Sequence, residues 1–242
     1  MCRGQSDVNT GASVSFAELE SSMYKRRRLN QPALPTTVDD VDGIISASRY
    51  ATENDGPFYR GCVHVNHGTD GTASVFAASK QLYILFSAQS MFMDDTFFTV
   101  PRLFYQLSTI FVVHESHVFP ACFVLLTRKT KVLYKAVFEH ITTLVPNFAP
   151  ENVMADYEDA SVHALREVFD NGLIVKGCWF HFSNFVIKRV RSVGLTDSFH
   201  NDAMVRKCIK ALTCLPLLPH DQIVATLDLL CQYATDVQVC AV

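Results

Sequence analysis

The chain has 242 residues, of which 49% are hydrophobic and 19% charged, so it can bury a sizeable core and is not globally disordered. A net charge of −3 excludes attraction to nucleic acid through overall charge, so such binding would need local basic patches. The amino terminus lacks the apolar stretch of a secretory signal, and the longest apolar runs are too short to span a bilayer. We therefore expect a soluble intracellular chain with no membrane contact, whose eight scattered cysteines are reduced and mostly buried.

Residues 1–43 are polar, and we expect them to form a basic N-terminal arm that is partly disordered. A cluster of four basic residues, 25–28, is followed by two prolines and three aspartates between positions 32 and 42. Prolines and runs of charge disfavour a packed element. The basic cluster fits a nuclear import signal or a phosphate contact, and a solvated run of charge explains it equally well.

Residues 44–193 are expected to form one α/β domain that begins with a hairpin. Gly61–Val65 alternates apolar and polar residues, a turn-forming stretch follows, and Thr72–Phe76 is predicted as the returning strand. A short helix is expected over Ser79–Ser87. Three β-type runs with short links then predict an antiparallel meander: Ser90–Val100, Phe104–His114 and Val118–Leu126.

Helices alternate with short strands after the meander. Apolar spacing predicts an amphipathic helix over Lys131–Leu144, and helices are also expected over Asp159–Phe169 and Phe182–Val193. Asn152–Asp156 and Leu173–Cys178 are predicted as strands. Since βα crossovers join parallel strands, we expect a mixed five-stranded sheet, a three-strand antiparallel meander plus two parallel strands, flanked by helices. Residues 194–242 are expected to form an all-helical extension.

Two aspartates stand at strand positions where a carboxylate needs a partner. Asp94 lies inside an otherwise apolar run, and Asp156 ends the fourth strand. If these strands are neighbours, the two carboxylates converge on one site. Mg²⁺ takes one or two protein carboxylates, and a pair of such ions supports phosphoryl transfer. Asp156 also precedes a helix, where an aspartate commonly serves as a cap, so the pattern alone leaves both interpretations open.

Three blocks of this sequence resemble the catalytic region of Mutator-like element (MULE) transposases. In the first, Asp94-Asp-Thr-Phe stands before a proline and is followed by Gln106-Leu. The second is Met-Ala-Asp156-Tyr-Glu158, and the third is Cys178-Trp-Phe-His181, a Cys-x-x-His element. The blocks occur in the family's order and spacing.

The resemblance implies an RNase H-like fold with a DDE-type active site. Asp94 and Asp156 would be catalytic residues and ligands of a two-metal Mg²⁺ (or Mn²⁺) site. The implied activity is metal-dependent cleavage of DNA and strand transfer to target DNA, so the partners would be transposon ends and target rather than a small-molecule substrate. The resemblance also implies a location in the nucleus, and it is compatible with a homo-oligomer.

The sequence departs from the family pattern at two points. Asp95 stands where the usual first block has glycine, and strand alternation directs its side chain to the face opposite Asp94. Family members carry a third catalytic acid, a glutamate on a helix beyond an all-helical insertion, whereas Glu167 is the last glutamate here. We therefore expect residues 194–242 to be a truncated start of that insertion, and this chain to be incomplete or inactive. The alternative is a transposase-derived, non-catalytic DNA- or protein-binding module.

Further candidate residues follow the second aspartate. Cys178 and His181 have metal-ligand spacing, but a structural zinc needs four ligands and no second such pair follows. The resemblance implies that they support the active site, and ordinary packing where the strand meets the helix is the alternative. Lys188, Arg189 and Arg191 give the following helix a basic face, which fits either DNA phosphate contacts or a solvated surface.

Overall fold

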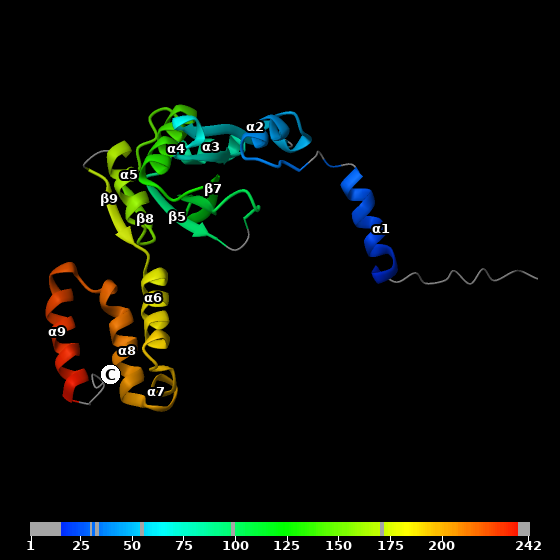
Figure 1. Ribbon diagram of the computed structural model, residues 1–242. Coiled ribbons are helices and arrows are strands. Elements are labelled where there is room, and N and C mark those ends of the chain that lie inside the picture. The colour runs from blue at the N-terminus through cyan, green and yellow to red at the C-terminus, as the bar shows by residue number, and fades with distance from the viewer. Residues whose placement is uncertain are drawn as a thin grey trace, which may run out of the picture.

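A seven-stranded mixed sheet lies at the centre of the computed structural model, which describes residues 16–29, 31, 34–53, 56–97, 100–169 and 172–236 (Figure 1). The strand order is β3-β4-β7-β6-β5-β8-β9. The strands are β3 (Tyr59–Val65), β4 (Gly71–Phe76), β5 (Ser90–Thr96), β6 (Gln106–His114), β7 (His117–Leu126), β8 (Asn152–Ala155) and β9 (Ile174–Gly177). Two further strands, β1 (Thr52–Glu53) and β2 (Gly56–Pro57), pair only with each other.

The predicted α/β fold with a mixed sheet is confirmed, but the sheet has two more strands than the five predicted. Strands β5, β6 and β7 form the expected antiparallel meander, and β8 and β9 continue it in parallel. The difference is the β3–β4 hairpin, which we predicted as a separate element. Its strand β4 pairs with β7, where Val75 faces Val124 and both are buried, so the hairpin covers an edge that would otherwise expose its backbone groups.

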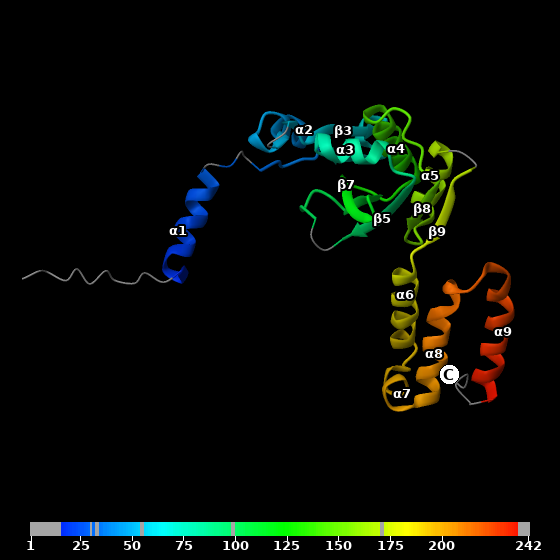
Figure 2. The ribbon, with the colours of Figure 1, turned by 180° about the vertical axis from the view of Figure 1, so that it is seen from behind.

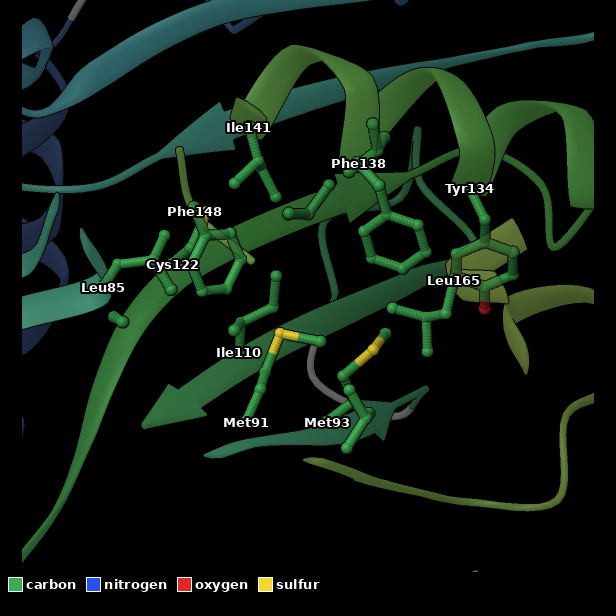
Figure 3. Packing of buried hydrophobic residues seen from close by; sticks show 14 of the residues in the cluster. Leu85, Met91, Met93, Ile110, Cys122, Tyr134, Phe138, Ile141, Phe148 and Leu165 are labelled. Carbon is green, nitrogen blue, oxygen red and sulfur yellow. The ribbon is translucent and has the colours of Figure 1, made fainter. Parts of the chain in front are cut away.

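Three helices bury their apolar faces against one side of the sheet: α3 (Ser79–Phe86), α4 (Lys131–Leu144) and α5 (Asp159–Phe169). Figure 3 shows the resulting core, in which Met91 and Met93 of β5 lie beneath Phe138 and Tyr134 of α4. Side chains alternate along a strand, so Asp95 shares the face of Met91 and Met93 whereas Asp94 lies on the other. The core therefore fixes which aspartate points away from α4.

The packed part of the chain begins before residue 43, the predicted end of the N-terminal arm. Helix α2 (Asp39–Ser46) contacts β3, buries Val41, and accepts a 2.7 Å hydrogen bond at Asp42 Oδ1 from the Tyr59 hydroxyl. Helix α1 (Phe16–Leu29) carries the basic cluster and lies beyond α2, away from the sheet, in Figures 1 and 2. Residues 1–15 of the predicted arm lie outside the described residues.

The C-terminal region is helical, as predicted, with α6 (Trp179–Ser192), α7 (Thr196–Asn201), α8 (Ala203–Cys214) and α9 (His220–Asp236). Helix α6, which we assigned to the sheet domain, instead packs on α8. The two helices share a small core of Val186, Val190, Val205 and Ile209. Within the described part of the chain, no helix is long and apolar enough to cross a membrane.

Gly71 at the start of β4 provides a test of this packing. Its φ is +123°, and a Cβ there would lie 2.9 Å from Cδ2 of the buried Leu133. We expect Gly71→Ala to lower the free energy of unfolding by about 1–3 kcal/mol, because it adds both backbone strain and a clash. Chemical denaturation measures the change.

Gly43 in α2 offers a matched control, since nothing lies within 4 Å of a Cβ built there. Gly43→Ala should raise the free energy of unfolding by about 0.5–1 kcal/mol, because alanine favours a helix interior. Denaturation midpoints that shift in the same direction for both variants would contradict the packing described for Gly71.

Candidate active site

The parallel pairing of β5 with β8 brings the two predicted catalytic aspartates to the same edge of the sheet. The register aligns Met91 with Val153 and Phe92 with Met154. Continued by two residues, it places Asp94 level with Asp156, which directly follows the last residue of β8. Both side chains thus stand at the carboxyl ends of neighbouring parallel strands.

Asp94 is exposed and faces α6. Its Oδ1 lies 3.7 Å from Nε2 of His181, which is in the first turn of that helix. Cys178 occupies the N-cap of α6, and its backbone N–H donates a 2.8 Å hydrogen bond to the carbonyl of Ala155 at the end of β8. Of the predicted support residues, His181 therefore lies beside Asp94, whereas Cys178 anchors the start of the helix that carries His181.

Asp156 has a local structural role as well as a place at the strand end. Its Oδ1 accepts a 3.1 Å hydrogen bond from the backbone N–H of Glu158, two residues on, which forms an Asx turn before α5 rather than a cap on the helix itself. The Glu158 carboxylate in turn pairs with Lys129 Nζ at 2.9 Å. These contacts hold the turn after β8 in a fixed position.

A groove with a volume of about 710 Å³ opens beside Asp156 between the sheet edge and α6. It is lined by acidic, basic and aromatic side chains: Phe97, Lys129, Asp156, Tyr157, Glu158, His181, Phe182, Phe185 and Lys188. Of the three predicted DNA-binding residues, Lys188 lines the groove, and Arg189 and Arg191 are exposed elsewhere on α6.

Phe185 and Lys129 line the groove but were not singled out in the sequence. Phe185 follows His181 by four positions and precedes the predicted Lys188 by three, a spacing that places all three on one face of a helix and could have been recognised. Lys129 had no such signal, because its partner Glu158 is 29 positions away.

Asp95 lies on the opposite face from Asp94, as predicted, in a polar cluster beneath the groove. Its Oδ2 accepts hydrogen bonds from the Tyr134 hydroxyl at 3.1 Å and from Gln106 Nε2 at 3.2 Å. Burial raises the pKa of Asp95 to about 6; contacts with Ser108 and Tyr134 lower this pKa, whereas the negative charges of Asp156 and Asp94 raise it. Three carboxylates therefore influence one another at this edge of the sheet.

This carboxylate arrangement fits a divalent cation that is bound in part by water and phosphate. Among the described residues, no three His, Cys, Asp or Glu side chains gather closely enough to hold a metal ion by themselves. Mg²⁺ commonly uses only one or two protein carboxylates, a number that Asp94 and Asp156 supply. The negative charges of Asp156 and Asp94, which add to the effect of burial in raising the Asp95 pKa, also favour a cation here.

The fold and the groove together define an α/β domain with an acidic site at the carboxyl ends of adjacent parallel strands. Residues 90–184 match the family model of the MULE transposase domain, from the first residue of β5 into α6. The match includes Asp94, Asp156, Cys178 and His181. No curated protein matches the chain. This segment of the chain is therefore similar to a MULE transposase domain.

The raised pKa of Asp95 predicts a pH-dependent stability. The folded protein holds this proton up to about pH 6, whereas the unfolded chain releases it near pH 3.8. Stability is therefore lost as the pH rises through this window, and the loss levels off above about pH 6. With a chelator present to remove metal ions, we expect Asp95→Asn to raise the free energy of unfolding by about 1–3 kcal/mol near neutral pH. Near pH 4, where the folded protein keeps the Asp95 proton, the substitution should change the free energy of unfolding little.

Denaturant titrations of the parent and the variant at both pH values measure this difference. Taking the difference between the two proteins removes the contribution of titrating groups that lie far from Asp95. An equal effect of Asp95→Asn at the two pH values would show that the Asp95 carboxylate is not held in its protonated form by the fold.

Proposed function

We propose that this domain catalyses metal-dependent cleavage and strand transfer of DNA, the chemistry of transposition. The observation that supports this proposal is the convergence of Asp94 and Asp156 at the ends of paired parallel strands, inside the segment that matches the transposase domain. The match itself indicates a transposase-related function and, with it, an interaction with DNA. The carboxylate pair specifies which residues would act.

The two aspartates, His181 and Lys188 each have a distinct role under this proposal. Asp94 and Asp156 would hold Mg²⁺ or Mn²⁺, which when bound would activate the attacking oxygen and stabilise the leaving one. His181, 3.7 Å from Asp94, would orient that carboxylate. Lys188 would contact a DNA phosphate from the opposite wall of the groove.

One observation favours a second candidate, a non-catalytic DNA-binding module. Among the described residues, no third acidic side chain stands close enough to Asp94 and Asp156 to share a metal ion with them. The last glutamate of the chain, Glu167, pairs instead with Lys131 and Lys135 of α4. In this candidate the groove would bind DNA without cutting it.

The exposed basic residues of α1 support a location in the nucleus, where the proposed substrate is found. Lys25, Arg26, Arg27 and Arg28 follow one another in the last turns of the helix, and all four are exposed. We propose that this cluster serves as a nuclear import signal.

The metal site can be tested by titrating the chain with Mn²⁺ in a calorimeter. We expect Asp94→Asn and Asp156→Asn each to weaken Mn²⁺ binding at least about tenfold, because each removes a charged oxygen ligand. Asp197→Asn is the matched control, since Asp197 is an exposed acid on α7 outside the groove. It should leave Mn²⁺ binding unchanged.

A nicking assay on supercoiled DNA with Mn²⁺ then separates the two candidates. Nicking by the parent that disappears in Asp94→Asn would support the transposase chemistry. DNA binding and Mn²⁺ binding without nicking would favour the non-catalytic module. Mn²⁺ binding that is indifferent to both aspartate substitutions would contradict the proposed site.

A further inference from the structure

The groove beside Asp156 has aromatic walls that its proposed carboxylate chemistry does not use. Phe97, Tyr157 and Phe185 line it, and all three side chains are exposed. Aromatic rings gathered in an exposed cleft commonly mark a binding surface, because leaving such apolar area in water is unfavourable. These rings therefore need a ligand that offers flat, apolar faces.

Neighbouring groups hold two of these rings in position. The Phe97 ring meets the Tyr105 ring edge-on with centroids 5.7 Å apart, and the Tyr157 ring lies 6.2 Å from that of Phe182. The Tyr157 ring also rests against Gly177, where a Cβ would come 2.5 Å from its Cζ atom. Because Gly177 has no side chain, Tyr157 can lie directly against the backbone of β9. Phe97 and Tyr157 therefore form a preorganised part of the groove surface, and Phe185 extends it from α6.

Positive charge lies on both walls of the same groove. Lys129, beside the turn after β8, pairs with Glu158 at 2.9 Å, and Lys188 projects from α6 three residues beyond Phe185. Lysines next to aromatic rings are the combination that binds single-stranded nucleic acid, in which phosphates meet cations and bases stack on rings. Paired bases cannot make this contact, because both of their faces are already stacked within the duplex.

We propose that the groove binds a nucleic acid strand with at least one unpaired nucleotide, whose base stacks on the Phe97–Tyr157–Phe185 surface. The inference rests on the proposed function in that it specifies the form of DNA that reaches Asp94 and Asp156. Lys188 contacts a phosphate of the bound strand. The groove thus selects DNA that is already opened or frayed over intact duplex.

The test measures binding of a fluorescently labelled oligonucleotide to the full chain by anisotropy in EDTA, so that no cleavage can occur. We expect the single strand to bind at least about tenfold more tightly than the same sequence as a blunt duplex. Phe185→Leu, which keeps an apolar side chain but removes the ring, should weaken single-strand binding about tenfold. Phe185→Tyr keeps the ring and should retain the affinity.

Tyr83→Ala is the matched control. Tyr83 is 72% exposed, like Phe185 at 67%, but it lies on α3 outside the groove, so its loss should leave binding unchanged. Lys188→Ala should reduce the slope of log affinity against log salt by about 0.7, the value for one phosphate contact on a single strand.

Two results would overturn the inference. One is a duplex bound as tightly as the single strand. The other is a Phe185→Leu variant that binds the single strand as tightly as the parent does. If that variant also loses self-association of the chain, the Phe185 ring contacts a second copy of the chain instead of a base. Because these measurements need neither metal nor cleavage, they are independent of the nicking assay. Ring-dependent binding without nicking would leave this inference standing while the proposed catalysis failed.

Discussion

The parallel pairing of β5 with β8 is the constraint on which the site depends. Asp94 and Asp156 belong to strands separated by the rest of the meander and by α4, and only the register of this pair brings them level. A shift of one residue would turn Asp94 toward the core and Asp95 toward α6. Burial of Met91 and Met93 beneath α4 opposes that shift. The shift would put the Phe92 ring and the charged Asp94 in the buried positions of the two methionines. The hydrophobic core therefore selects the aspartate that faces His181 of α6.

The same alternation explains why the two adjacent aspartates behave differently. Asp94 is exposed next to His181, whereas Asp95 is held by Tyr134 and Gln106 in the interior. Burial destabilises a charged carboxylate, so Asp95 keeps its proton to a higher pH. Helix α6 completes the site from the other side, since its N-cap Cys178 is hydrogen-bonded to the end of β8. One helix face can then present His181, Phe185 and Lys188 together.

The sequence predicted most of the sheet because the meander depends on local patterns, and it placed Asp94 and Asp156 at strand positions that the structure brings level. Alternating apolar runs and short links define the meander, and Asp94 interrupts one such run. The β3–β4 hairpin was predicted as an element but not as part of the sheet, because its pairing with β7 is a contact between distant segments. Lys129 was missed for the same reason, since nothing near it in the sequence indicates Glu158. The packing of α6 on α8 likewise depends on a shared core that no single helix shows.

The most direct test of the account is a crystal of the chain soaked in Mn²⁺, with anomalous diffraction recorded at the metal edge. The shared strand-end site predicts an anomalous peak about 2.1 Å from carboxylate oxygens of both Asp94 and Asp156. A peak bound elsewhere on the molecule, or carboxylates of Asp94 and Asp156 that remain metal-free at saturating Mn²⁺, would contradict it.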